Sequence, residues 1–146
     1  MKYINENLIL LNLKVKNKWD LINIFIKNLY DDSRIINKEL ILEDIIRREE
    51  LSSTYIGNGI SLVHTMNKEV IFSSVGIAKL SNSIQWDSEG NFSDLIIIIC
   101  LNVDNQNDKY AFKDFVRSLV DSNFIRELRE TNNKEEIKAL VEGKLL

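Results

Sequence analysis

One short stretch of the sequence combines residue types that can handle an anion. Hydroxyl residues at 52–54 precede a Gly57-Asn58-Gly59 turn, and a short apolar run then leads to His64. The turn can expose backbone N–H groups, which together with the hydroxyls could hold an anion such as a phosphoryl group. Imidazole is largely neutral, and therefore nucleophilic, while it still exchanges protons near neutral pH. The stretch is therefore a candidate site with His64 as its reactive group. The pattern alone also allows a structural role for His64, which is the more frequent one for a lone histidine at the end of a strand.

The composition excludes several other classes of site. The 146 residues include one histidine, one cysteine and no proline, so a two-histidine zinc motif, a cysteine zinc site and a disulfide framework are excluded. The 19 basic residues face 22 acidic ones, for a net charge of -3, which disfavours nucleic acid as a partner. The longest apolar run, 95–101, is far short of the roughly 20 residues that span a bilayer. We expect a cytoplasmic protein without direct membrane insertion.

The elements that must position these residues alternate between strand-like and helix-like patterns, which predicts an α/β domain over residues 1–146. Strands are expected over 8–15, 60–64, 70–80 and 95–103, the last as a central strand covered on both faces, and a loop or hairpin is expected over 81–94. Helices are expected over 18–30, from an Asn37 cap to a polar end at 47–50, and across 112–143 with a break near Asp121. In this interpretation His64 stands at the end of its strand.

The stretch from Arg48 to His64 closely resembles the signature of a known family, the enzyme IIA domain of the bacterial phosphoenolpyruvate-dependent sugar phosphotransferase system, fructose/mannitol type. That family reads R-E-x-x-x-S-T-x-x-G-x-G-I-A-x-P-H, and this chain reads R-E-E-L-S-S-T-Y-I-G-N-G-I-S-L-V-H. Further counterparts lie at 75–78, 84–86 and 95–101. The resemblance implies an α/β/α sandwich, in which a mixed β-sheet carries helices on both faces.

The resemblance also implies a phosphoryl carrier. In the family, the histidine accepts a phosphoryl group from the phosphocarrier protein HPr and passes it to a cysteine or histidine of a IIB domain. Carried over, His64 is the phosphorylated nucleophile and Arg48 stabilises the phosphoryl group, unless it is only a solvated arginine at a helix end. Thr54, Gly57 and Gly59 are lesser contributors, and Thr54 can equally be a turn-capping hydroxyl. The chemistry needs no metal or organic cofactor.

Several positions depart from the family pattern. The usual Pro-His-Gly is Val63-His64-Thr65 here, so the two residues that fix the backbone around the nucleophile are replaced. The second histidine of many members is absent, and its region aligns loosely with Asp108 to Tyr110. Tyr110 could hydrogen-bond the phosphoryl group or the imidazole, whereas Asp108 could only orient the imidazole. Glu69 is the candidate for the family's acidic residue after the nucleophile.

Three functions remain open at this point. A phosphoryl carrier for sugar uptake is favoured by Arg48, Gly57, Gly59 and His64, which all match the family motif. A phosphorylatable regulatory module is favoured by the missing second histidine, because a switch tolerates slow transfer. A degenerate binding module without phosphorylation is disfavoured by the retained His64. For the first two we expect exposed apolar residues ringed by charge around His64, where HPr and a IIB domain would dock.

Overall fold

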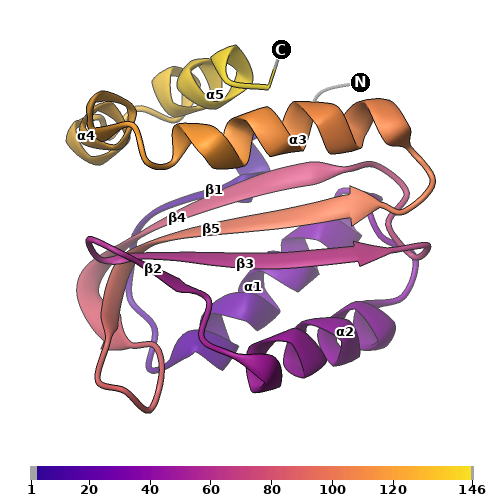
Figure 1. The fold of residues 1–146 in the computed structure, drawn as a ribbon, viewed down its shortest axis with the longest axis horizontal. Coiled ribbons are helices and arrows are strands. Elements are labelled where there is room, and N and C mark those ends of the chain that lie inside the picture. The colour runs from indigo at the N-terminus through magenta and orange to yellow at the C-terminus, as the bar shows by residue number, and fades with distance from the viewer. Residues whose placement is uncertain (1–2, 146) are drawn as a thin grey trace.

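A five-stranded β-sheet with helices on both faces forms the protein, whose computed structural model describes residues 3–145 (Figure 1). Two helices, α1 (Lys18–Asp31) and α2 (Lys38–Leu51), cover one face. The other face carries α3 (Gln106–Ser118), α4 (Ser122–Glu130) and α5 (Lys134–Gly143). The expected α/β/α sandwich is therefore confirmed. No helix within residues 3–145 combines the length and apolar character needed to cross a membrane.

The sheet is mixed and has the strand order β1-β4-β5-β3-β2. Its strands are β1 (Ile9–Leu13), which follows a short 3-10 helix (Glu6–Leu8), β2 (Tyr55–Gly57), β3 (Ile60–Asn67), β4 (Ser74–Gln85) and β5 (Phe92–Asn102). The central strand, β5, is parallel to β3 and antiparallel to β4. Residues 95–100 of β5 are all buried, which explains the continuous aliphatic run and confirms the predicted central strand.

Asparagine and aspartate side chains start the helices. Asn37 accepts a hydrogen bond from the backbone N–H of Leu40, as its position before α2 predicts. Asn17, Asn105 and Asn133 do the same for α1, α3 and α5. These caps fix where each helix begins, and with it which residues of α2 come close to β3.

The structure corrects the predicted strand boundaries in two places. The strand predicted over 70–80 is β4, which begins at Ser74 and runs on to Gln85, and Val70 forms only an isolated bridge with Ile35. The loop or hairpin expected over 81–94 is a hairpin, since antiparallel β4 and β5 are joined by the turn between Gln85 and Phe92, but β4 extends further than predicted and pairs with β5 again at Ile84 and Gln85 beyond an irregularity. Pairing with β5 also extends β3 to residue 67, so His64 lies within its strand and not at the end.

Candidate functional site

His64 lies on the face of the sheet that carries α3, beside an open strand edge. Side chains alternate along β3, and Thr65 donates a hydrogen bond to Asp44 of α2 on the opposite face. His64 therefore shares its face with Leu62 and Met66. The register of β2 pairs it with only the first two residues of β3. Among residues 3–145, no other strand pairs with the outer edge of β3 beside His64, and a side chain from α2 can reach around that edge.

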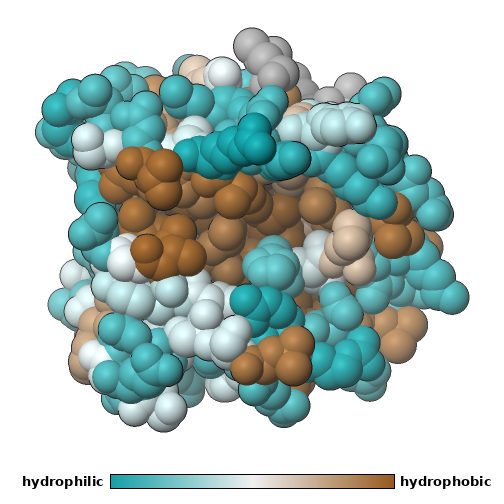
Figure 2. Space-filling view, viewed as in Figure 1, coloured by the Kyte–Doolittle hydropathy of each residue, from teal (hydrophilic) through white to brown (hydrophobic). Residues whose placement is uncertain are grey.

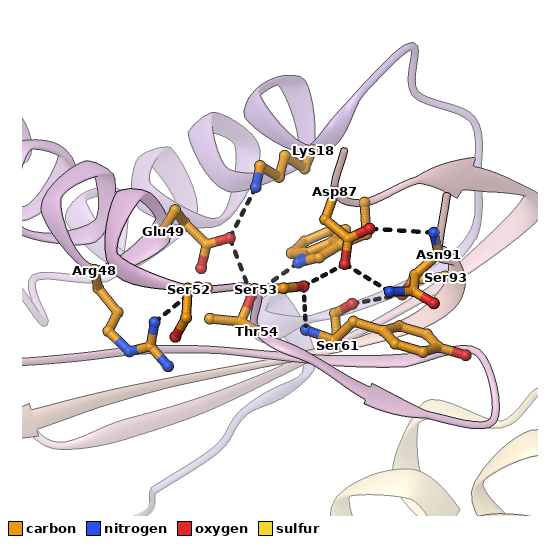
Figure 3. A network of polar contacts seen from close by, with 12 residues as sticks. Lys18, Arg48, Glu49, Ser52, Ser53, Thr54, Ser61, Asp87, Asn91 and Ser93 are labelled. Atoms are coloured by element: carbon orange, nitrogen blue, oxygen red, sulfur yellow. Dashed lines mark hydrogen bonds and ion pairs between the residues drawn. The ribbon is translucent and has the colours of Figure 1, made fainter. Parts of the chain in front are cut away.

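Arg48, in the last turn of α2, makes that reach. Its Nε donates to His64 Nε2 at 3.2 Å, and its Nη1 donates to the Ser52 carbonyl oxygen at 3.0 Å, just beyond the helix (Figure 3 shows the bond to Ser52). Since Nε2 accepts this bond, the proton of the neutral ring is on Nδ1 and the lone pair is on Nε2. The structure thus brings together the two residues that the sequence motif singled out.

The surroundings favour the neutral, nucleophilic form of His64. Partial burial of the ring lowers the pKa of His64 below its ordinary value, because burial disfavours the charged imidazolium. The positive charge of Arg48 acts in the same direction, whereas the negative charges of Glu49 and Asp44 oppose both. The net effect is a lowered pKa, which favours the neutral ring at neutral pH.

The pocket around His64 is open to solvent and carries both signs of charge. Its lining residues are Asp44, Arg47, Arg48, Glu50, Leu51, His64, Thr65 and Met66. Leu51 and Met66 are exposed to 81% and 51%, so apolar surface flanks the imidazole as expected. Across the described residues 3–145, no group of three or more His, Cys, Asp or Glu side chains is placed to hold a metal ion.

An apolar groove lies on the face of the sheet that carries α3 and α4, the face towards which the His64 side chain points. It runs between α3–α4 and β2–β3, where Figure 2 shows a hollow with gathered hydrophobic surface. Its apolar lining is Ile56, Ile60, Leu62, Val116, Leu119, Val120 and Ile125, and its charged lining is Arg126, Arg129 and Glu130. Because Leu62 precedes His64 by two residues on the same face, the groove leads towards the imidazole.

The glycine turn lies at the far end of that groove. At about 3.3 Å per strand residue, Gly59 stands roughly 16 Å from His64 along β3. Arg129 of α4 donates to the Asn58 carbonyl oxygen at 2.6 Å and to Asp94 at 2.9 Å. Gly57 lines the groove. The turn therefore fastens α4 to the sheet, and it does not contribute to the pocket that contains His64.

Thr54 points into the protein, away from the pocket. Its Oγ1 donates to Glu49 Oε1 at 3.0 Å and accepts from Trp86 Nε1 at 2.8 Å, and the residue is buried. Both contacts are with buried side chains, so they are neither the backbone contact of a turn-capping hydroxyl nor a contact in the pocket around His64. Trp86, which the sequence placed in a loop, packs its indole inside the protein.

The remaining candidates from the sequence lie outside the His64 pocket. Tyr110 is 63% exposed on α3 and lines neither the pocket nor the groove. Glu69 sits in the turn after β3, where its carbonyl oxygen accepts from the Ile36 N–H at 2.9 Å. Asp108 is buried and accepts a 2.7 Å bond from the Tyr3 hydroxyl, which raises the pKa of Tyr3 to about 12. Asp108 thus anchors the N-terminal segment to α3.

Sequence reasoning missed Glu49, which it assigned to a polar helix end. The side chain is only 2% exposed, and its Oε1 also accepts from Lys18 Nζ at 3.0 Å (Figure 3). The signal was present in the helical spacing, because Ile41, Ile45 and Glu49 stand four residues apart on one buried face.

Comparison with known proteins adds a family and a shared fold. The family model for the phosphoenolpyruvate-dependent sugar phosphotransferase system, EIIA 2, matches residues 2–144. A multiphosphoryl transfer protein of Shigella flexneri is 32% identical over 104 residues, covering 70% of this chain, which matches only 12% of that longer protein.

Two solved structures share the fold at low identity. The nitrogen regulatory protein IIA-Ntr from Neisseria meningitidis has a TM-score of 0.80 at 18% identity, covering 95% of this chain and 96% of the other. The complex of enzyme IIA-mannitol and phosphorylated enzyme IIB-mannitol from Escherichia coli has a TM-score of 0.79 at 19% identity, covering 98% of this chain and 99% of the other.

Proposed function

Because the chain belongs to the EIIA 2 family of the phosphoenolpyruvate-dependent sugar phosphotransferase system, we propose that it is a phosphoryl carrier that works through His64. The observation that carries the proposal is the bond from Arg48 Nε to His64 Nε2. It places a fixed positive charge beside a neutral imidazole nitrogen at the surface. In-line phosphoryl transfer requires a nucleophile with a positive charge close to it, because that charge stabilises the negative phosphoryl group during transfer.

The transfer follows from this geometry. His64 Nε2 attacks the phosphorus of a phosphohistidine on the donor protein, for which HPr is the proposed identity. The new N–P bond forms as the donor's N–P bond breaks, and the electron pair of the broken bond returns to the donor imidazole. Arg48 releases Nε2 and turns its N–H groups to the phosphoryl oxygens, where charge-assisted bonds are stronger.

The second step returns the phosphoryl group to another protein. A cysteine or histidine of a IIB domain attacks the same phosphorus, and His64 leaves with the bonding electrons. The protein contributes position and charge in both directions, so no metal or organic cofactor enters either step. The Escherichia coli structure that pairs an enzyme IIA with a phosphorylated enzyme IIB supports a IIB domain as the acceptor.

Partner proteins would dock in the apolar groove. A donor must bring its phosphohistidine to an exposed imidazole, and Leu62 connects the groove to that imidazole. The groove offers apolar side chains with a rim of arginine and glutamate, the composition of a small transient interface.

A regulatory role is the second candidate. Val63 and Thr65 replace the usual residues on either side of His64, and the sequence has a single histidine. Both features are compatible with slow transfer, in which phosphohistidine at position 64 would act as a signal.

The test is incubation with phosphoenolpyruvate, enzyme I and HPr, followed by measurement of the intact mass. The wild-type protein is expected to gain one phosphoryl group, and His64→Ala is expected to gain none. Subsequent loss of the group to a IIB domain supports the carrier, whereas a stable phosphoprotein supports the regulator. A wild-type protein that gains nothing contradicts both.

A further inference from the structure

The buried carboxylate of Glu49 has no part in the transfer steps described above. It occupies the position on the buried face of α2 where the spacing of Ile41 and Ile45 would place a third apolar residue. Burying a charge costs free energy unless its partners compensate for the lost hydration. A carboxylate at this position therefore calls for a reason other than packing.

One oxygen of Glu49 joins several separate parts of the chain. Oε1 accepts from Lys18 at the start of α1 and from Thr54 in the segment between α2 and β2, each at 3.0 Å (Figure 3). Thr54 in turn accepts from Trp86, and Lys18 Nζ lies 5.5 Å from the centroid of the Trp86 ring. These contacts hold the last turn of α2 and the residues after it.

That turn is the one that carries Arg48. The guanidinium reaches the Ser52 carbonyl oxygen and His64 Nε2 together, so it needs both the helix end and the following segment in place. Glu49 is the next residue in the chain, and Thr54 is the second residue after Ser52. The Lys18–Glu49–Thr54 contacts therefore hold the residues next to the two that Arg48 depends on, which are Arg48 itself at the end of α2 and Ser52 after it.

The second oxygen of Glu49, Oε2, differs from Oε1 in its hydrogen bonding. Oε2 is buried and has no hydrogen-bond partner among the described residues 3–145. A carboxylate that served the fold alone would be expected to use both oxygens. Its charge instead acts on the site: partial burial and Arg48 lower the pKa of His64, whereas Glu49 and Asp44 raise it.

We propose that Glu49 is a positioning residue for the reaction at His64, holding the end of α2 from which Arg48 reaches the imidazole and balancing the charge of Arg48 there. The proposal rests on the proposed phosphoryl transfer. The other charged residues that line the pocket of His64 are Asp44, Arg47, Arg48 and Glu50, all from α2. Glu49 differs from them because its charge is shielded from solvent, and salt therefore screens it less.

Titration of the single imidazole by NMR in the full chain tests the charge. Glu49→Gln keeps the shape and removes the charge, so the pKa of His64 is expected to fall. Lys18→Gln removes the cation that neutralises Glu49, so the pKa of His64 is expected to rise. Glu49→Asp keeps the charge and is expected to restore the titration towards wild type. Glu43→Gln, an exposed glutamate of the same helix outside the pocket, is the matched control and is expected to leave the titration unchanged.

The rate of phosphoryl acceptance tests the positioning. Glu49→Gln is expected to slow it on the order of tenfold, because misplacing a catalytic contact costs large factors in rate. A titration and a rate equal to those of Glu43→Gln would overturn the proposal. Movement of the His64 pKa in the same direction in Glu49→Gln and Lys18→Gln would also overturn it, because loosening of the fold alone would give that result.

The two proposals fail in different ways. The NMR titrations need no phosphoryl donor, so a wild-type protein that is never phosphorylated ends the proposed function and leaves these titrations interpretable. If Glu49→Gln does not fold, Lys18→Gln, whose site is nearer the surface, decides the matter through the direction of its shift.

Discussion

In the phosphoryl transfer that we propose, Arg48 has two tasks at His64, and they belong to different moments of the reaction. In the free protein its Nε bonds to the lone pair of Nε2 and its charge helps to keep the ring neutral. During transfer the same guanidinium must leave that nitrogen and bond the phosphoryl oxygens. The charge stays beside His64 throughout, so the exchange replaces a bond to a neutral acceptor with stronger bonds to an anion.

Replacing Arg48 therefore changes both the rate and its pH dependence. Arg48→Gln is expected to slow phosphoryl acceptance at neutral pH by about a hundredfold, the usual cost of losing one donor to a developing charge. Arg48 lowers the pKa of His64, so its loss raises that pKa. Acceptance requires the neutral ring, and the decline on the acid side is therefore expected to begin at higher pH than in wild type. The measurement is the rate of acceptance against pH.

Arg47→Gln provides the comparison for this variant. Arg47 lines the same pocket, but its guanidinium is paired with Asp44 at 3.3 Å and not with His64. We expect a smaller loss of rate and a smaller change in the pH profile. An acid limb at the same pH in Arg48→Gln and wild type would show that Arg48 does not act on the imidazole.

At the scale of elements, α1 approaches the sheet closely. The contact that permits this approach is Phe25 of α1 against Gly76 of β4. A Cβ atom at position 76 would lie 2.7 Å from Phe25 Cε1 and 2.6 Å from Ile98 Cγ2, both inside the core. The glycine is needed for space between packed layers.

Gly76→Ala is therefore expected to destabilise the protein by about 1–3 kcal/mol, the range for overpacking a filled core. Gly143→Ala is the matched control, because position 143 ends α5 with open space around it, and alanine in a helix is favoured by up to about 1 kcal/mol. Urea unfolding of both variants gives the measurement. Equal free energies of unfolding in the two variants would show that α1 can shift to make room.

The elements also show how far the sequence alone could lead. Periodicity and capping predicted α1, the start of α2 and the central strand, because each depends on local residue types. The sequence did not predict β2, because a strand of only three residues, 55–57, has no periodic pattern. This strand pairs only with the start of β3. The end of β3 was wrong for a related reason: pairing with β5 decides it, and that partner is distant in the chain.

For the site, the motif identified Arg48 and His64, which the structure shows in contact. The spacing of the motif could not predict which other residues lie near them. Gly57 and Gly59 looked like part of an anion site because glycine turns often are, but the length of β3 separates them from the imidazole. Glu49 looked solvated because it stands in a charged run. Only its helical phase relative to Ile41 and Ile45 indicates burial.

At the scale of the whole molecule, the groove that we propose as the docking site lies on the face of the sheet that carries α3 and α4. The apolar groove is walled by α3–α4 and floored by β2–β3 (Figure 2), and Leu62 in its lining precedes His64 by two residues on the same face of β3. Val120 stands 90% exposed at the junction of α3 and α4, where it contributes little to the core. Because Val120 also lines the apolar groove, it belongs to the surface on which we propose that a partner docks.

Val120→Asp separates docking from folding. The substitution puts a charge on the groove wall, so we expect the KM for the phosphorylated donor to rise about tenfold, equivalent to about 1.4 kcal/mol of binding. The free energy of unfolding is expected to stay within about 0.5 kcal/mol of wild type, because the side chain is exposed. Ile36→Asp introduces the same charge at a residue that is 59% exposed before α2 and lines neither the groove nor the pocket. If both variants raised KM equally, added negative charge alone would explain the loss, whereas an effect confined to Val120→Asp locates the donor in the groove beside His64.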